Sequence, residues 1–297
     1  MGVVTTEDFE RLSAVFRGER GRRRAEIFMR MIALDRINRL YDNSSAHSGS
    51  AFAAGLLNDL GVNYYIGNAE RLNFLPEGAF ITVSNHPYGG LDGIILVDLF
   101  DRIRDDYKLM VNQILSLVRA MKGNFIEVTP SDKRKKGITA TSIGGIRETI
   151  ARLKEGHPVG FFPAGAVSDL RLKSLTIRDR PWQQGILRLI HSAKVPILPV
   201  RFFDRNSLFF YSLGLINWRI RMLRLPSEVF NKYRKVHRIG IGKIISVREQ
   251  EKFPDSRSLG AFLRKTIYKM PLPASFIPRN RIHFKEKQKG NIIVKLP

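Results

Sequence analysis

The chain has no cysteine, and its acidic residues are scarce beside its basic ones. With no thiol among 297 residues, disulfide bonds, thiolate zinc sites and a cysteine nucleophile are excluded. Lys and Arg number 50 against 27 Asp and Glu, which gives a formal net charge of +23. A charge of this sign favours a negatively charged partner, such as nucleic acid, an anionic membrane or an acidic protein.

Long apolar runs and the glycine patterns of nucleotide-binding loops are also missing. No run reaches about 18 apolar residues, so we expect no transmembrane helix and only peripheral contact with a membrane. Neither Gly-x-Gly-x-x-Gly nor the P-loop pattern occurs. The histidines other than His86 are scattered without metal-ligand spacing, so we expect neither a metal site nor a cofactor.

Residues 1–60 are predicted to form a helical segment separate from the rest of the chain. Apolar residues in 25–41 recur with a helical period and alternate with arginines. This pattern is typical of a basic amphipathic helix that lies on a membrane or packs on the protein. A polar break at 43–50 precedes a second predicted helix at 51–60.

In residues 61–297, short apolar and β-rich runs alternate with helical patterns. This alternation predicts an α/β domain with a mixed, largely parallel sheet flanked by helices. The predicted strands are 62–66, 79–84, 109–112, 125–128, 159–162, 197–203 and 239–247. The predicted helices are 92–104, 114–121, 141–154, 183–193 and 256–269.

The most informative segment lies between a predicted apolar strand and an apolar helix, and reads Asn85-His86-Pro87-Tyr88-Gly89-Gly90-Leu91-Asp92. Ligands of open α/β sheets bind at the carboxyl ends of strands, and two glycines allow a sharp turn there. Asp92 is placed to accept a hydrogen bond from His86, which would prepare the other ring nitrogen to take a proton at neutral pH. The alternative is a turn whose histidine only caps the helix.

A second loop follows the strand at 159–162 and contains Phe162-Pro163-Ala164-Gly165. Backbone N–H groups around Gly165 are candidates to stabilise the oxyanion of a tetrahedral intermediate. Ser168 does not lie in a Gly-x-Ser-x-Gly nucleophile elbow, which disfavours a serine hydrolase. The alternative here is an ordinary loop without a chemical role.

Four blocks of the sequence, taken together and in order, resemble the motifs of the glycerolipid acyltransferases. The blocks are 85–92, 123–128, 162–165 and 195–200, and the resemblance covers about 62–205. The chain is most similar to the bacterial branch of lyso-ornithine-lipid acyltransferases and hemolysin-like proteins. The run Trp182-Gln-Gln-Gly185 also resembles that branch.

The resemblance implies that His86 is the general base and that Asp92 orients it. It implies a fatty acyl donor that is acyl-acyl carrier protein or acyl-coenzyme A, a lyso-lipid acceptor, and no metal or covalent enzyme intermediate. The enzyme would be peripheral on the cytoplasmic face of the bacterial inner membrane, an anionic surface. The substrate-binding residues implied are Asn85, Tyr88, Gly89, Gly90, Phe162, Pro163, Ala164 and Gly165.

Departures from the family pattern affect the expected partner and acceptor. Five residues separate His86 from Asp92 where the family usually has four, so Asp98 stays an alternative partner. The usual arginine of the second block and glutamate of the third, both associated with a glycerol-phosphate acceptor, are missing. A lyso-aminolipid such as lyso-ornithine lipid is therefore expected, with lysophosphatidic acid as the alternative. In the alternative, phosphate would be bound by Arg147, Arg171, Arg178 or Arg201.

Two further interpretations and one surface complete the predictions. The high pI and basic runs such as 133–136 would suit a nucleic-acid-binding protein, but no binding motif is present and we expect no nucleic-acid partner. A degenerate, inactive lipid-binding member of the fold is the other alternative. The apolar run 209–218, followed by Arg219 and Arg221, is predicted to meet the bilayer. The acceptor groove is expected near Tyr88 and Leu91.

Overall fold

A computed structural model of the chain describes residues 2–112, 115, 118–129, 139–286 and 292–297. Its centre is an eight-stranded sheet in which β2 (Ile81–Ser84) pairs in parallel with β5 and β8. The full strand order is β10 (Phe276–Pro278), β1 (Tyr64–Gly67), β9 (His237–Ile241), β8 (Ile197–Phe202), β2, β5 (Val159–Phe161), β3 (Lys108–Asn112) and β4 (Phe125–Val128).

The sheet is mixed and largely parallel, as predicted. Antiparallel pairing occurs between β8 and β9 and between β1 and β10, whereas β1–β9 and the five strands from β8 to β4 pair in parallel. All four residues of β2 are buried, because helices cover both faces of a parallel sheet. The alternation of apolar strands and helical patterns therefore predicted the correct fold class.

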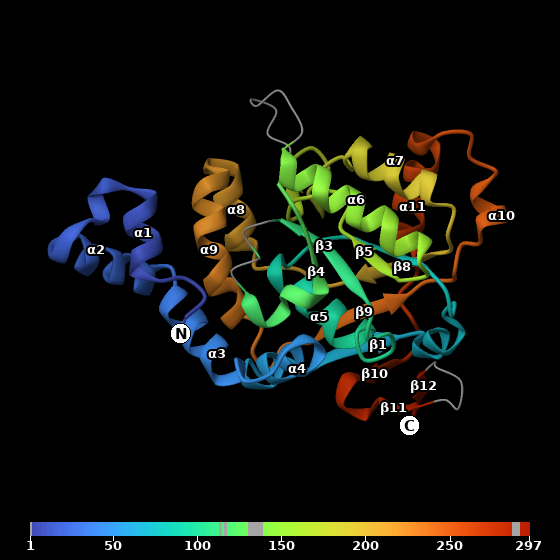
Figure 1. Cartoon of the computed structure of the whole chain (residues 1–297), viewed down its shortest axis with the longest axis horizontal. Helices are drawn as coiled ribbons and strands as arrows, with labels where there is room; N and C mark the ends of the chain where they lie inside the picture. Colours follow the sequence, from blue (N-terminus) through green and yellow to red (C-terminus); the bar gives the residue numbers. More distant parts are fainter. Residues whose placement is uncertain (1, 113–114, 116–117, 130–138, 287–291) are drawn as a thin grey trace.

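Helices cover the two faces of the sheet and form two apolar cores (Figure 1). On one face lie α4 (Gly49–Asp59) and α5 (Gly90–Phe100), whose side chains pack with strands β1 and β9. On the other face, α7 (Gln184–Ala193) and α11 (Ser256–Lys269) pack against Ile81 and Val83, and α6 (Ala140–Lys154) packs against β4.

The single amphipathic helix predicted at 25–41 is wrong. The chain forms α2 (Gly18–Met31) and α3 (Leu34–Ser44), and Ala33 between them adopts a left-handed conformation with φ of 63°. Helices α1 (Thr6–Leu12) and α2 pack on a small core of their own at one end of the molecule (Figure 1). Helix α4, by contrast, packs in the main core. The division of the chain at residue 60 stays a prediction.

Other differences lie in connecting segments. The predicted strand 239–247 ends at Ile241, and the predicted helix 114–121 is replaced by a 3-10 helix, Arg119–Asn124, with parts of the prediction outside the described residues. The basic run 133–136 also lies outside them. Two hairpins were not predicted, namely β6 (Asp169–Arg171) with β7 (Thr176–Arg178), and β11 (His283–Glu286) with β12 (Ile292–Lys295). In the described part of the chain, no helix has the length and apolar character needed to span a bilayer.

Candidate active site

The carboxyl ends of three adjacent parallel strands bring the predicted motifs together. Ser84 at the end of β2 pairs with Val200 of β8, and Val83 pairs with Phe161 at the end of β5. The loops that follow β2 and β5 are therefore neighbours at one edge of the sheet. This edge is where α/β folds place their ligand sites.

His86 and Asp92 meet at this edge. Nδ1 of His86 lies 2.9 Å from Oδ2 of Asp92, although the two atoms lack the alignment of a full hydrogen bond. The Asp92 side chain is fully buried, whereas the His86 side chain is 17% exposed. The imidazole also stacks on Phe162, with ring centroids 4.1 Å apart. With Nδ1 facing the carboxylate, Nε2 is the nitrogen that can exchange a proton with a substrate.

The same Asp92 oxygen caps helix α5. It accepts hydrogen bonds from the backbone N–H groups of Tyr88 at 2.8 Å and Gly89 at 3.0 Å. Burial raises the pKa of the Asp92 carboxyl, and His86 and the two amides oppose this shift. Asp92, and not His86, therefore caps helix α5. The His86 ring contacts the Asp92 carboxylate.

Gly89 makes this turn sterically feasible. Its φ of +90° lies in the region that favours glycine, and a Cβ there would come within 3.0 Å of Leu225 in α9 (Trp218–Phe230). Gly90 then begins α5. Gly89 therefore shapes the turn that brings the carboxylate back to the histidine.

The alternative prediction, that Asp98 is the partner of His86, is wrong. Its carboxylate accepts a hydrogen bond from Tyr64 Oη at 2.7 Å and forms ion pairs with Arg102 at 2.8 Å and Arg279 at 3.0 Å. All of these contacts lie away from His86. Asp98 is a structural charge inside the protein, neutralised by two arginines.

Asp179 is a central residue of the site that was missed from the sequence. Its fully buried carboxylate accepts hydrogen bonds from the His86 backbone N–H at 3.1 Å, Ser168 Oγ at 2.6 Å and Trp182 Nε1 at 3.2 Å. Ser168 also donates its backbone N–H to the His86 carbonyl at 2.9 Å. The two motif loops are thus tied together at His86 itself, and the Ser168 hydroxyl serves this network.

In the loop at Gly165, the Gly165 amide itself is bonded within the protein, while the oxyanion role of the N–H groups around it stays a prediction. Gly165 has φ of +61°, and its N–H donates to the Phe162 carbonyl at 2.9 Å, so this amide is not available to a substrate oxyanion. The loop is held further by the Gln183 backbone N–H, which donates to the Pro163 carbonyl at 2.8 Å. Pro163 and Ala164 are buried, and Phe162 is partly exposed beside His86.

Asn85 and Tyr88, both predicted to bind substrate, point into the protein. The Asn85 side chain donates to the Phe202 carbonyl at 2.9 Å and accepts from the Phe202 N–H at 2.8 Å. It thereby joins the ends of β2 and β8. Tyr88 is 2% exposed, and its hydroxyl lies 3.2 Å from Nδ1 of His237. We correct both residues to a supporting role. Leu91 is buried as well, and the acceptor groove expected near Tyr88 and Leu91 stays a prediction.

Helices α8 (Leu208–Ile216) and α9 contact the loop that carries His86 from outside the sheet. Tyr211 donates its hydroxyl to the Pro87 carbonyl at 3.0 Å, and Phe210 packs with Val167. Arg221, predicted as a cation for the bilayer, is buried and forms an ion pair with Asp169. Part of the predicted membrane segment therefore serves to fix the site.

The four arginines considered for phosphate binding have different surroundings. Arg147 is exposed on α6, and Arg201 donates to the carbonyls of Tyr268 and Met270. Arg171 and Arg178 lie together in a separate pocket. Among the residues that the structure describes, no group of three or more His, Asp or Glu side chains is arranged to hold a metal ion.

Sequence comparison assigns this arrangement to a family. The family model described as Acyltransferase matches residues 25–274, which is most of the chain. The chain belongs to this acyltransferase family. It is an acyltransferase enzyme, and the paired His86 and Asp92 lie within the matched region.

Curated relatives and one solved structure are similar to this acyltransferase. The chain is 27% identical to a lyso-glycine lipid O-acyltransferase of Bacteroides thetaiotaomicron, over 81% of the chain and 87% of the relative. It is 25% identical to a protein of the same name from Phocaeicola vulgatus, over 80% and 83%. The 1-acyl-sn-glycerophosphate acyltransferase PlsC of Thermotoga maritima shares 15% identity with a TM-score of 0.48, over 74% and 76% of the two chains.

Proposed function

We propose that this acyltransferase transfers a fatty acyl group from a thioester donor to the hydroxyl of a lyso-aminolipid. The observation that carries the proposal is the 2.9 Å contact between His86 Nδ1 and the buried Asp92 carboxylate at the carboxyl end of β2. The names of the two curated relatives support a lyso-lipid acceptor and O-acylation. The donor proposed is acyl-acyl carrier protein or acyl-coenzyme A.

The proposed reaction is a direct displacement in which His86 moves the proton. Nε2 takes the proton from the acceptor hydroxyl as its oxygen attacks the thioester carbonyl carbon. Asp92 stabilises the resulting imidazolium. When the tetrahedral intermediate collapses, the C–S bond breaks and the carrier thiol takes the proton from His86. Atoms and charge balance without a covalent enzyme intermediate.

The acceptor proposed is an N-acylated amino acid with a free hydroxyl on its acyl chain. Lyso-glycine lipid and lyso-ornithine lipid both meet this description, and the relatives favour glycine. In the third motif block Ala164 stands where the glycerol-phosphate enzymes have a glutamate, which supports an acceptor of another kind. Lysophosphatidic acid is the acceptor that the test must exclude.

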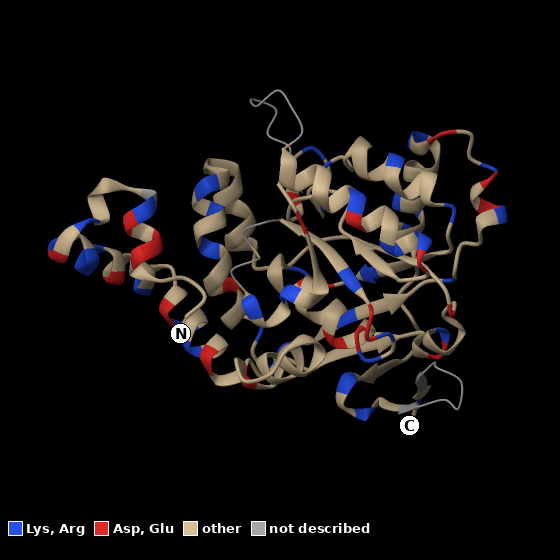
Figure 2. Ribbon diagram, viewed as in Figure 1, with Lys and Arg blue, Asp and Glu red and all other residues tan. Residues whose placement is uncertain are grey.

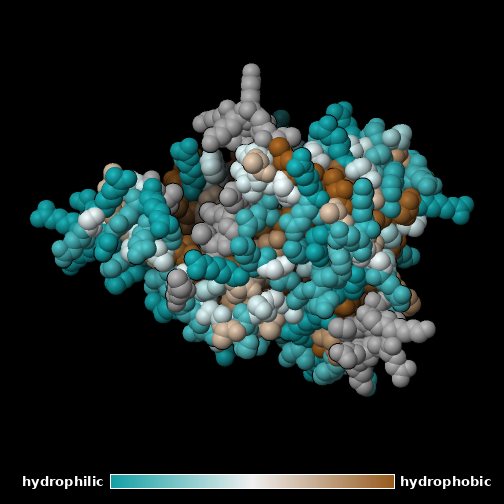
Figure 3. All heavy atoms as spheres, viewed as in Figure 1, coloured by the Kyte–Doolittle hydropathy of each residue, from teal (hydrophilic) through white to brown (hydrophobic). Residues whose placement is uncertain are grey.

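A peripheral membrane location, on the cytoplasmic face, is part of the proposal. Exposed apolar side chains gather on α8 and α9, and Figure 3 shows apolar atoms in the recess beside these helices. Arginines lie among them and over the molecule generally (Figure 2), as the guanidinium of Arg219 over the Trp218 ring illustrates. Apolar side chains with neighbouring cations suit the interface of an anionic bilayer. The exposed apolar residues are Leu208, Phe209, Leu215, Ile216, Trp218, Ile220, Met222 and Leu223.

The activity is tested with purified protein and defined lipids. Wild type and His86→Ala are incubated with palmitoyl-acyl carrier protein or palmitoyl-coenzyme A and each of three acceptors, namely lyso-glycine lipid, lyso-ornithine lipid and lysophosphatidic acid. Mass spectrometry should detect a diacylated aminolipid with wild type only. Acylation of lysophosphatidic acid alone, or an equal rate with His86→Ala, would overturn the proposal.

Membrane contact is tested separately by vesicle sedimentation. Vesicles of phosphatidylglycerol and phosphatidylcholine should pellet wild type, and the variant Ile216→Ser/Trp218→Ser should bind about tenfold more weakly because two exposed apolar groups are lost from the interface. The matched control is Leu172→Ser/Leu175→Ser, which removes exposed apolar groups from the β6–β7 hairpin. Equal binding by both variants, or binding to duplex DNA in place of vesicles, would contradict this assignment.

A further inference from the structure

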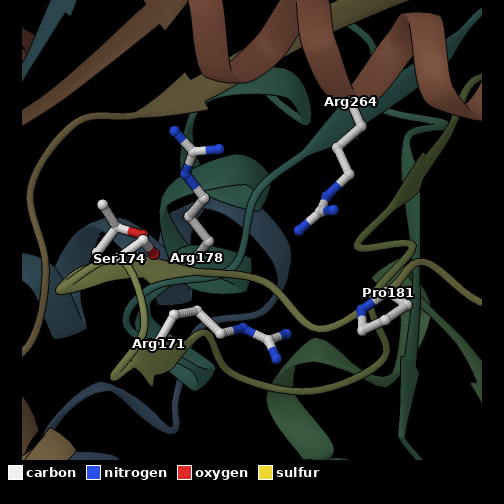
Figure 4. Close-up of a pocket in the computed structure, with 6 residues that line it drawn as sticks. Arg171, Ser174, Arg178, Pro181 and Arg264 are labelled. Carbon is white, nitrogen blue, oxygen red and sulfur yellow. The ribbon is translucent and has the colours of Figure 1, made fainter.

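A basic pocket of about 360 Å³ lies beside the catalytic loops, between the β6–β7 hairpin and helix α11. Figure 4 shows three arginine side chains from separate segments surrounding a common space. Hydroxyl groups and one proline complete the wall, so the pocket suits a small polar group rather than a fatty chain. Its lining residues are Arg171, Ser174, Thr176, Arg178, Pro181 and Arg264.

The three guanidinium groups have no carboxylate partner within ion-pair distance in the described part of the chain. Nearby arginines do have one: Arg180 pairs with Asp169 at 2.6 Å. Like charges at short range disfavour each other, and an arginine carries five N–H donors arranged to bind an oxyanion. The pocket therefore combines uncompensated positive charge with donors that match phosphate or carboxylate.

Contacts with the protein hold these arginines in place. Arg171 and Arg264 each donate one N–H to the backbone carbonyl of Asp179, at 3.3 and 2.7 Å. Arg178 and Arg264 lie over the ring of Tyr268, 5.3 and 5.5 Å from its centroid. Burial lowers the pKa of the neighbouring Arg201, and the charge of Arg178 adds to this in the same direction.

The pocket is joined to the catalytic loop through one residue. The Asp179 carbonyl accepts from the pocket arginines, while the Asp179 carboxylate accepts from the backbone N–H of His86. An anion bound by the arginines would therefore sit at a fixed position relative to the catalytic imidazole. Such a fixed position suits a group that takes part in orienting a substrate.

We propose that Arg171, Arg178 and Arg264 form an oxyanion-binding subsite that anchors the phosphate or carboxylate group of one of the two substrates. The role as a substrate subsite rests on the acyl transfer proposed above. Two sources share this chemistry: the carboxylate of the acceptor headgroup, and the phosphates of the donor's pantetheine arm. Kinetics with each substrate varied in turn distinguish them.

The first test is binding of inorganic phosphate to the full-length protein, measured by calorimetry at low salt. Arg178→Gln removes an exposed arginine, and Arg264→Gln removes a second pocket charge. The matched control is Arg257→Gln, since Arg257 is an exposed arginine on the same helix α11 but outside the pocket. Wild type and the control should bind alike, and each pocket variant should bind about tenfold more weakly, because a charge-assisted contact is lost.

The second test is steady-state kinetics of the same four proteins. A raised KM for acyl-coenzyme A alone in the pocket variants assigns the subsite to the donor, and a raised KM for the lyso-lipid alone assigns it to the acceptor. Phosphate affinity and both KM values within twofold of the control would overturn the proposal. If wild type transfers no acyl group at all, the acyl-transfer proposal fails, while phosphate binding still decides whether the pocket is an anion site.

Discussion

The two ends of helix α5 carry buried carboxylates with opposite surroundings. Asp98, in the last turn, is neutralised by Arg102 and Arg279 and bonds Tyr64. Asp92, in the first turn, has no arginine among its contacts and instead meets His86 and two backbone amides. The first arrangement stabilises a fold. The second leaves a carboxylate whose charge is available to a histidine, which is what a general base requires.

The largest effect is expected from His86→Ala. Removing the general base should lower kcat/KM for acyl transfer by about 10² to 10⁴-fold. The folded state should persist, because the His86 backbone bonds to Asp179 and Ser168 do not need the imidazole. Lipid product is measured by mass spectrometry and folding by circular dichroism. A variant that keeps more than half of the wild-type rate would remove His86 from the mechanism.

Asp98→Asn should affect stability more than chemistry. The substitution leaves Arg279 buried without a full counter-charge, and such a loss costs about 3–5 kcal/mol. Urea denaturation measures this change, and acyl transfer by the fraction that stays folded should be close to wild type. Normal stability together with lost activity would reverse the roles assigned to the two ends of α5.

Asp92→Asn should show the converse behaviour. The amide oxygen can still accept from the Tyr88 and Gly89 amides, so helix α5 stays capped. The negative charge beside His86 is lost, and the rate should fall by about 10² to 10⁴-fold, because an orienting carboxylate keeps the base in its working tautomer and stabilises its charged form. Equal rates for Asp92→Asn and wild type would show that the 2.9 Å contact has no catalytic role.

The pH dependence of stability offers a smaller and independent test. Because burial raises the pKa of Asp92, the folded protein binds this proton more tightly than the unfolded chain. The stability that this proton contributes is fully present below the unfolded pKa of 3.8. It is lost as the pH rises through the pKa of Asp92 in the folded protein. Relative to Asp92→Asn, wild type should thus lose stability as the pH rises above about 4, by about 1.4 kcal/mol for each pKa unit by which the folded and unfolded states differ. Urea denaturation at several pH values measures this, and the opposite slope would contradict it.

Local patterns were sufficient to predict most of the sheet and the contact between His86 and Asp92. Apolar strands ending in polar, glycine-containing loops are short-range signals, so β2, β5 and β8 and the placement of His86 beside Asp92 could be predicted. The break at Ala33 could not, because the flanking apolar period continues through it. Alanine rarely adopts a left-handed conformation, so nothing in the local sequence indicates a helix break at this position.

The supporting residues were missed for a related reason. Asp179 gains its importance from donors in three different segments, and nothing in its immediate sequence marks it as buried. Asn85 and Tyr88 were assigned to substrate because they flank His86, yet their side chains contact Phe202 and His237 inside the protein. Proximity in sequence to His86 therefore predicted the loop correctly but not the direction of each side chain.

The central claim is that His86 and Asp92 act as one unit, and a double-mutant cycle of acyl-transfer rates tests it most directly. His86→Ala, Asp92→Asn and the double variant are assayed together with wild type. If the carboxylate acts only through the imidazole, the double variant should be no slower than His86→Ala alone. Independent, multiplicative losses from the two substitutions would contradict the account.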